Sequence, residues 1–296
     1  MADEQLHRVT LSTGVELDVQ VAGHPTNPAI ILLHGFPESH RTWRHQIDRL
    51  AEEHFVLAPD QRGYAKSSKP AAVDNYTPDK IVADLLALAD RFEITRFTLV
   101  GHDWGGAVAW MAALQNPDRV ARLVIINAPH PFVFQRLLFD DTAQREASQY
   151  IRAFRNPDLE KHIDSIGLSA FFDTSFMKHT DFEKVKPEKP VYLEQWGQPG
   201  AMTAMLNWYR ASSLIVPAMD ETPERPAWLD GPFPPMPQPV LVIWGTGDKA
   251  LLPSNLDGLD ALVPQLTLVT VDAGHFVPWE SPDAVTDAIL RWGRGA

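Results

Sequence analysis

One short stretch, residues 101–106, places a carboxylate where a nucleophile elbow holds its reactive side chain. The stretch reads Gly101-His-Asp-Trp-Gly-Gly106, which fits the pattern Gly-x-Nu-x-Gly with Asp103 at the centre. Glycines flank the centre of such an elbow because the turn is too tight for neighbouring Cβ atoms. An apolar run precedes the stretch and a helical run follows it, which favours a catalytic Asp103 over a simple helix N-cap.

A carboxylate nucleophile restricts the chemistry that this site can perform. Attack on an acyl carbon would give an anhydride, so the natural target of Asp103 is an sp3 carbon that carries a leaving group. The product is an alkyl ester of Asp103, which water must later cleave at the carbonyl carbon. Epoxides and alkyl halides are the two substrate classes that fit. We expect an ionised Asp103 at neutral pH, because a model Asp has a pKa of about 3.9 and a helix N-terminus favours the anion.

Two residues at predicted strand ends are expected to form the base that ester hydrolysis requires and the carboxylate that orients this base. The reactive groups of open α/β sheets lie at the carboxyl ends of the strands. His275 follows the last predicted strand and would activate water, because histidine titrates in the useful range. Asp248 follows the preceding strand and would orient the imidazole, in preference to Asp257 and Asp272. The order of nucleophile, acid and histidine is that of the α/β-hydrolase triad.

Two backbone N–H groups are predicted to form an oxyanion hole for the hydrolytic step. One belongs to Phe36, within the strand-end segment His34-Gly-Phe-Pro37, and the other to Trp104, directly after the nucleophile. We expect Pro37 to fix the loop that carries Phe36. The sequence leaves the isomer of the Phe36–Pro37 peptide bond open.

These residues require a scaffold in which strands and helices alternate. After an opening hairpin over Val9–Val21, strands are predicted for Ala29–Leu33, Phe55–Pro59, residues 98–100, Val120–Ile126, Pro239–Trp244 and Leu266–Val271. Helices are predicted for Trp43–Ala51, Asp79–Phe92, the segment after the elbow, and Asp283–Trp292. Apolar runs without polar alternation indicate strands covered on both faces. The predicted fold class is therefore α/β, with a mostly parallel, doubly wound sheet.

The alternation of strands and helices stops at Pro131. The following residues read as helices, including Thr142–Phe154 and Gly200–Ser212, and a proline-rich stretch then returns to the sheet. We predict an α/β-hydrolase core of residues 1–131 and 229–296, with residues 132–228 inserted between the sheet halves as a helical lid.

Length and composition fit a large α/β core with an inserted subdomain. The chain has 296 residues, of which 45% are hydrophobic and 22% charged, as in ordinary soluble enzymes. A net charge of -12 argues against nucleic acid and anionic membrane surfaces as partners. With 0 cysteines, disulfides and thiolate metal sites are excluded. Neither a secretory signal nor an apolar run of about 20 residues is visible, so the expected location is cytoplasmic.

The motifs in this order resemble those of the epoxide hydrolase branch of the α/β-hydrolase superfamily. The matching residues are His34-Gly-Phe-Pro37, Gly101-His-Asp-Trp-Gly-Gly106, Asp248, His275 and Asn207-Trp-Tyr-Arg210. The similarity spans nearly the whole chain and is loosest between Asp158 and Val191. It implies two lid tyrosines that donate hydrogen bonds to the epoxide oxygen, which match Tyr209 and Tyr150, with Tyr192 in reserve. A phenol with a pKa of about 10 can donate to an oxygen that is becoming an alkoxide.

The resemblance also implies a two-step cycle. Asp103 opens the epoxide while Tyr150 and Tyr209 donate to the ring oxygen, and water activated by His275 and Asp248 then releases a vicinal diol. The cycle needs no metal and no organic cofactor. The expected partners are a small neutral epoxide and water, and the sequence leaves a homodimer open. The substrate is expected to contact the aromatic residues Phe36, Trp104, Phe154 and Trp208, in a pocket that also holds Phe134, Phe171 and Phe172.

Three other interpretations fit the sequence less well than epoxide hydrolysis. Haloalkane dehalogenases share the Asp elbow, but they bind the halide with two N–H donors, and Phe36 offers no side-chain donor. Fluoroacetate dehalogenases carry arginines after the nucleophile, where this chain has Trp104 and Ala107. A non-catalytic ligand-binding module would have no physical need for a nucleophile, an acid and a base, although the fold alone does not exclude it.

Overall fold

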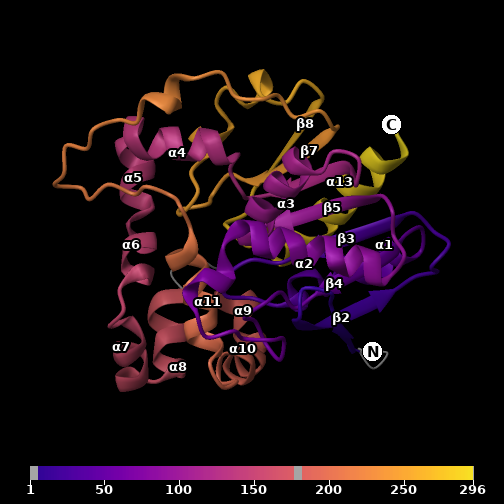
Figure 1. Ribbon diagram of the computed structural model, residues 1–296, viewed down its shortest axis with the longest axis horizontal. Helices are drawn as coiled ribbons and strands as arrows, with labels where there is room; N and C mark the ends of the chain where they lie inside the picture. Colours follow the sequence, from indigo (N-terminus) through magenta and orange to yellow (C-terminus); the bar gives the residue numbers. More distant parts are fainter. Residues whose placement is uncertain (1–5, 177–181, 296) are drawn as a thin grey trace.

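The computed structural model describes residues 6–176 and 182–295, which form a sheet of eight strands, helices on both of its faces, and a helical insertion (Figure 1). The strand order is β1-β2-β4-β3-β5-β6-β7-β8. The strands are β1 Leu6–Thr10, β2 Glu16–Ala22, β3 Ala29–Leu33, β4 Phe55–Pro59, β5 Phe97–His102, β6 Val120–Ile126, β7 Val240–Gly245 and β8 Leu266–Val271. Strand β2 pairs antiparallel with β1 and β4, and the other neighbours pair parallel. The prediction of a mostly parallel α/β sheet is confirmed.

Strand β5 lies in the middle of the sheet, between β3 and β6. Its Leu99 lies opposite Ile31 of β3 and Leu123 of β6, so the carboxyl ends of these strands reach the same edge. Strands β7 and β8 continue the sheet beyond β6 in parallel register. The loops that follow β5, β7 and β8 therefore emerge at one edge, where parallel sheets place their ligands.

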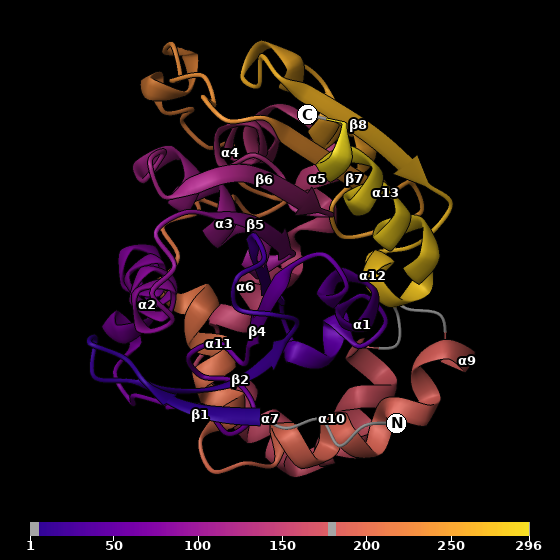
Figure 2. The same ribbon diagram turned by 90° about the vertical axis from the view of Figure 1, so that its right-hand side faces the viewer.

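Helices cover the sheet on both faces because β3 and its neighbours are apolar on both sides. Ile30 belongs to a buried cluster with residues of α1 and α13, whereas Ile31 belongs to the cluster that contains α2 and α3. Figure 2 shows the two pairs of helices on opposite sides of the strands. These helices are α1 Ile47–Ala51, α2 Pro78–Arg91, α3 Trp104–Gln115 and α13 Pro282–Arg294, and the short α12 Val277–Glu280 precedes α13.

The insertion between β6 and β7 consists mainly of helices and lies along the left side of Figure 1. Its described helices include α4 Pro131–Asp140, α5 Thr142–Ala147, α6 Gln149–Arg155, α7 Leu159–Ile166, α8 Leu168–Phe171, α9 Phe182–Val185, α10 Lys189–Trp196 and α11 Ala201–Ala211. It is bound to the core through indole donors: Trp196 Nε1 donates to the Pro37 carbonyl at 2.8 Å, and Trp208 Nε1 donates to the Arg62 carbonyl at 2.9 Å. The division into a lid of residues 132–228 and a core remains a prediction.

Two predicted helices were wrong in extent. Of the predicted helix Trp43–Ala51, only Ile47–Ala51 forms an α-helix, which is α1. Trp43 ends a 3-10 turn, His40–Trp43, which begins where Ser39 Oγ accepts the Arg41 N–H. The predicted helix Thr142–Phe154 is divided into α5 and α6 at Ser148, whose φ of -94° and ψ of 2° depart from helical values.

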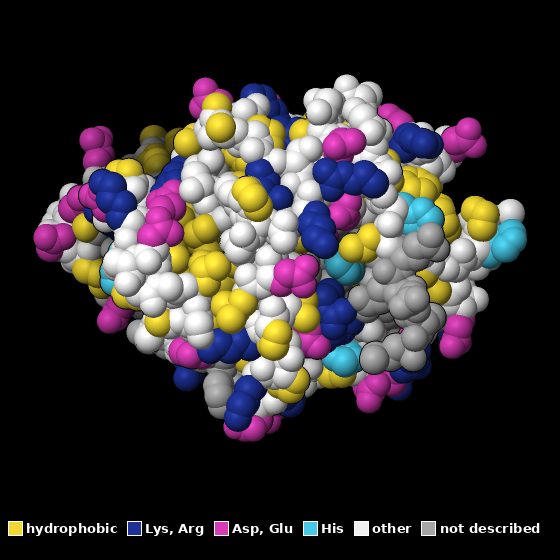
Figure 3. Space-filling view, turned by 90° about the horizontal axis from the view of Figure 1, so that it is seen from below, with side chains coloured by type: hydrophobic (Ala, Val, Ile, Leu, Met, Phe, Trp, Pro, Cys, Tyr) yellow, Lys and Arg dark blue, Asp and Glu magenta, His cyan; other side chains and the backbone are white. Residues whose placement is uncertain are grey.

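The surface of the molecule carries charged side chains of both signs. On the face in Figure 3, Lys and Arg side chains are interspersed with Asp and Glu rather than gathered by sign. Within the described part of the chain, no helix is both long enough and apolar enough to cross a membrane.

Candidate active site

Asp103 occupies a sharp turn between β5 and α3. Its φ of 52° and ψ of -122° lie in a region that non-glycine residues rarely adopt, at a cost of about 1–3 kcal/mol. The turn depends on Gly101, because a Cβ there would overlap the Gly105 carbonyl oxygen. The strained backbone presents the Asp103 side chain above the sheet edge, as the elbow pattern predicted.

The Asp103 carboxylate is bound on one side and faces a histidine on the other. Its Oδ1 accepts the Phe36 N–H at 2.7 Å, and its Oδ2 lies 3.5 Å from His275 Nε2. Burial raises the pKa of Asp103, but the His275 imidazole and the Trp104 N–H outweigh that effect and hold the pKa below its ordinary value. The side chain is therefore an anion at neutral pH.

His275 and Asp248 form a buried pair next to Asp103. His275 Nδ1 lies 2.7 Å from Asp248 Oδ2, which also accepts the Asn127 Nδ2 at 2.7 Å. The other oxygen, Asp248 Oδ1, accepts the N–H groups of Ala250 and Leu251 at 2.8 and 3.0 Å. The structure thus brings His275 together with Asp248, and not with Asp257 or Asp272, as the strand-end argument predicted.

The two carboxylates favour the charged form of His275. Burial lowers the pKa of His275, but Asp248 and Asp103 raise it well above its ordinary value. The two carboxylates thus favour an imidazolium at His275 in the resting site. In this state Nδ1–H donates to Asp248 and Nε2–H is directed toward Asp103.

The N–H groups of Phe36 and Trp104 both reach Asp103. Phe36 donates to Oδ1, and the Trp104 N–H bond contributes to the lowered pKa of the carboxyl. The peptide bond between Phe36 and Pro37 is cis. The two predicted oxyanion-hole donors are thus directed at one carboxylate, which is the group that becomes an ester carbonyl in the predicted cycle.

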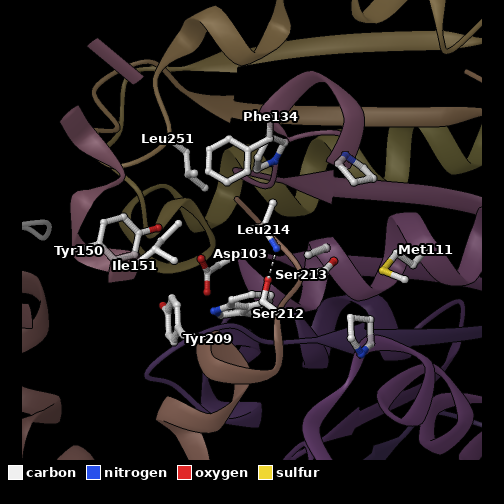
Figure 4. A pocket seen from close by; sticks show the side chains of 15 residues that line it. Asp103, Met111, Phe134, Tyr150, Ile151, Tyr209, Ser212, Ser213, Leu214 and Leu251 are labelled. Carbon is white, nitrogen blue, oxygen red and sulfur yellow. Dashed lines mark hydrogen bonds between the residues drawn. The ribbon is translucent and has the colours of Figure 1, made fainter. Parts of the chain in front are cut away.

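Tyr150 and Tyr209 reach the site from the insertion and lie on the same side of Asp103 (Figure 4). Tyr150 is on α6 and Tyr209 on α11, and their ring centroids are 6.2 Å apart. Burial and the negative charge of Asp103 raise the pKa of both phenols well above the ordinary value. Both hydroxyls therefore stay protonated and can act as donors.

A cavity of about 140 Å³ joins Asp103 to the two tyrosines. Its lining residues are Pro78, Asp103, Trp104, Ala107, Met111, Pro129, Pro131, Phe134, Tyr150, Ile151, Tyr209, Ser212, Ser213, Leu214 and Leu251. Asp103 is the single charged residue among them, so the cavity is apolar with one reactive carboxylate and a few hydroxyl groups. Figure 4 shows Ser213, Leu214 and Met111 on the side of Asp103 away from the tyrosines.

Several predicted pocket residues lie outside the lining of this cavity. Trp208 is directed away from it, because its indole binds Arg62. Phe36 and Phe154 pack against the Tyr209 ring at centroid distances of 5.2 and 4.9 Å, so they contact a lining residue rather than the cavity itself.

Three further aromatic predictions lie elsewhere in the insertion. Phe171 and Phe172 pack against the ring of Trp196, at centroid distances of 5.9 and 5.7 Å. Tyr192, the reserve tyrosine, donates its hydroxyl to Glu38 Oε1 at 2.6 Å. This aromatic cluster is absent from the cavity lining, because its rings fill the space between the insertion and the loop after β3.

Two polar residues near the triad had no assigned role in the sequence prediction. Asn127 follows β6, has a φ of 39°, and donates to Asp248. The sequence signal for Asn127 was its position directly after a predicted strand. His102 is fully buried, and its Nε2–H donates to the His275 carbonyl oxygen at 2.9 Å. The position of His102 directly before Asp103 in the elbow motif was the sequence feature that pointed to this residue.

Among the described residues, no group of three or more His, Asp or Glu side chains is arranged to hold a metal ion.

Comparison with known proteins places this geometry in a family. Residues 28–282 match the family model described as alpha/beta hydrolase fold. The chain belongs to the α/β-hydrolase superfamily, in its epoxide hydrolase branch. It is 36% identical to AB hydrolase superfamily protein YfhM of Bacillus subtilis, over 95% of both chains. It is 31% identical to Epoxide hydrolase A of Mycobacterium tuberculosis, over 97% of both.

A solved structure is similar over almost the whole chain. It comes from a study of novel epoxide hydrolases of the α/β-hydrolase superfamily in metagenomes from hot environments. The identity is 47%, the TM-score is 0.91, and 99% of each chain is covered. The α/β-hydrolase fold predicted from the sequence is confirmed.

Proposed function

We propose that this α/β-hydrolase converts small, neutral epoxides into vicinal diols through an alkyl ester on Asp103. The observation that carries the proposal is the cavity in which Asp103 faces two tyrosines, the partly buried Tyr150 and the buried Tyr209. The similarity to proteins named as epoxide hydrolases supports the same reaction.

In the first step, Asp103 Oδ2 attacks one carbon of the epoxide. The bond from that carbon to the ring oxygen breaks, and the oxygen takes a proton from Tyr150 or Tyr209. Neutral phenols beside a carboxylate are suited to this step, since they donate without adding charge to an apolar cavity. The product is a hydroxyalkyl ester of Asp103 and one tyrosinate, which takes up a proton from solvent. Since the esterified Asp103 carries no charge, His275 releases its own proton to solvent and becomes the neutral base of the second step.

In the second step, water attacks the carbonyl carbon of the Asp103 ester. His275 removes a proton from the water, and Asp248 stabilises the imidazolium that forms. Negative charge collects on Oδ1, where the N–H groups of Phe36 and Trp104 stabilise it. The bond between the carbonyl carbon and Oδ2 then breaks, the alkoxide is protonated by His275, and the diol leaves.

The cavity favours small and uncharged substrates. Its volume of about 140 Å³ is below the roughly 300–1,000 Å³ of pockets for drug-sized ligands. Its described lining residues include no Lys, Arg or His, so an anionic epoxide would face the Asp103 carboxylate with no cation in the cavity lining. We expect aryl- or alkyl-substituted epoxides to react and epoxides that carry a carboxylate to react poorly.

A side-by-side assay on styrene oxide and 1-bromobutane tests the proposal. The expected result is formation of the diol from styrene oxide without release of bromide from 1-bromobutane. Release of bromide without diol would contradict the proposal and favour a haloalkane dehalogenase. A turnover in ¹⁸O-labelled water adds a second criterion, because the label should enter the peptide that contains Asp103.

A further inference from the structure

Gln144, on α5, is fully buried and uses its whole hydrogen-bonding capacity. Its Nε2 donates to the Ala250 carbonyl oxygen and to Ser148 Oγ, both at 2.9 Å. Its Oε1 accepts the Leu252 N–H at 2.8 Å and the Asn255 Nδ2 at 2.6 Å. An amide has two N–H donors and an oxygen with two lone pairs, so no hydrogen-bonding group of this side chain is left over.

The loop that Gln144 holds is the loop that positions Asp248. Asp248 Oδ1 accepts the N–H groups of Ala250 and Leu251. Gln144 binds the carbonyl of Ala250 and the N–H of Leu252, which are the backbone groups directly next to these donors in the chain. Movement of this backbone would move the donors, and with them the carboxylate that orients His275.

The same helix leads into the segment that carries Tyr150. Ser148 lies between α5 and α6, is fully buried, and accepts a hydrogen bond from Gln144. A second connection lies at the start of α5, where Asp141 Oδ1 accepts the Ala143 N–H and Asp141 Oδ2 accepts the Ser254 hydroxyl, both at 2.9 Å. Helix α5 is thus bound to the loop after Asp248 at two points. Helix α6, which carries Tyr150, follows α5 directly in the chain.

We propose that Gln144 is a positioning residue that couples the placement of the proton donor Tyr150 to the placement of Asp248. One buried amide then fixes the geometry of both half-reactions. Gln144 is absent from the cavity lining, so it acts through the backbone of residues 250–252 and through Ser148. The assignment of the two half-reactions rests on the proposed function.

The test compares Gln144→Met with the wild-type protein and with Gln135→Met. Methionine keeps the length of glutamine and removes its donors. Gln135, on α4, is also buried and binds both the N–H and the carbonyl of Ile215 at 2.8 Å, so its loss removes a similar two-point contact away from Asp248. In single-turnover experiments, we expect ester formation and ester hydrolysis each to slow by about 10- to 100-fold in Gln144→Met. Gln135→Met is expected to keep the wild-type hydrolysis rate.

NMR titration of the His275 imidazole measures the same coupling without turnover. Since Asp248 raises the pKa of His275, displacement of Asp248 in Gln144→Met should lower that pKa, and Gln135→Met should leave it unchanged. Asn255→Ala removes one partner of Gln144 and is expected to give a smaller shift in the same direction, which keeps the test usable if Gln144→Met does not fold.

The outcomes separate the two proposals. Wild-type rates and an unchanged His275 pKa in a folded Gln144→Met, or equal effects in Gln135→Met, would overturn the positioning role. If only Asn255→Ala can be studied, an unchanged His275 pKa in that variant would also overturn the positioning role of Gln144. A wild-type protein that forms no diol, with the expected pKa shift in Gln144→Met, would overturn the proposed function and leave the structural coupling to Asp248 intact.

Discussion

The Phe36 N–H lies 2.7 Å from Asp103 Oδ1, so one oxygen of the proposed nucleophile is held before any substrate arrives. The other oxygen, Oδ2, faces His275 Nε2 at 3.5 Å. The two oxygens therefore have different surroundings. Oδ1 already lies where the oxyanion will form, and Oδ2 is left for attack on the epoxide carbon. This asymmetry means that a single carboxylate can act as nucleophile first and as ester carbonyl afterwards without reorientation.

Replacement of Asp103 by asparagine should abolish steady turnover. The amide keeps the size of the side chain but lacks an anionic oxygen, so we expect kcat to fall by more than about 1,000-fold, on the scale seen for lost nucleophiles in other hydrolases. Asp272→Asn is the matched control, because Asp272 is an exposed carboxylate close to His275 in sequence. The test is the initial rate of diol formation. Full activity of Asp103→Asn from the first cycle would contradict the assignment of Asp103 as the nucleophile.

Replacement of His275 by glutamine should separate the two steps. Ring opening uses Asp103 and the tyrosines, so the alkyl ester should still form, but its hydrolysis loses the base. We expect the peptide that contains Asp103 to gain the mass of the substrate under saturating epoxide, as measured by mass spectrometry after rapid quenching. Absence of this adduct in a folded variant would count against a two-step cycle.

Substitution of Tyr150 or Tyr209 by phenylalanine should slow ring opening more than ester hydrolysis. Each change removes one proton donor, and general acid catalysis contributes about 10²- to 10⁴-fold. Because the second tyrosine remains, we expect a loss near the lower end of that range for each single variant. Tyr192→Phe is the control, since its hydroxyl binds Glu38 outside the cavity lining. Equal slowing of both steps in single-turnover kinetics would assign the tyrosines to packing instead.

The strands and the elbow could be predicted because their signals are local. Ala29–Leu33 agrees with β3 residue by residue, since a strand buried on both faces is continuously apolar. Val120–Ile126 agrees with β6 in the same way, and its apolar signal comes from the four buried residues at its end. Asp103 was recognisable because the elbow needs glycines at fixed offsets. The contact between His275 and Asp248 could be predicted from the ends of their strands, because parallel strands deliver their following loops to one edge.

Features that depend on distant contacts could not be predicted from the sequence. The division of α5 from α6 accompanies a hydrogen bond from Gln144 to Ser148 and another from Gln144 to Ala250, which is 106 residues away. The orientation of α11 is a second case. Trp208 and Tyr209 are consecutive, and an α-helix turns by about 100° per residue, so only one of them could face the cavity. The motif identified the pair but not the rotation of the helix.

The pH dependence of ester hydrolysis should differ from the titration of the free enzyme. In the free enzyme, Asp248 and Asp103 raise the pKa of His275, so the imidazole stays protonated well above its ordinary range. In the alkyl ester, Asp103 carries no charge, so only Asp248 still raises the pKa of His275. Hydrolysis needs neutral His275, so its rate should increase with pH, with a midpoint below the His275 pKa of the free enzyme.

Two measurements test this order of the His275 pKa values. NMR titration gives the pKa of His275 in the free enzyme, and the decay of the adduct across pH, followed by rapid quenching, gives the value in the ester. Asp103→Asn removes the same charge without substrate, and it should lower the His275 pKa in the titration. The raised pKa of His275 also stabilises the folded state. This stabilisation is complete at pH values below the pKa of His275 in the unfolded chain, about 6.5, and it is lost as the pH rises through the higher pKa of His275 in the folded protein. An adduct midpoint at or above the free-enzyme pKa would contradict the argument.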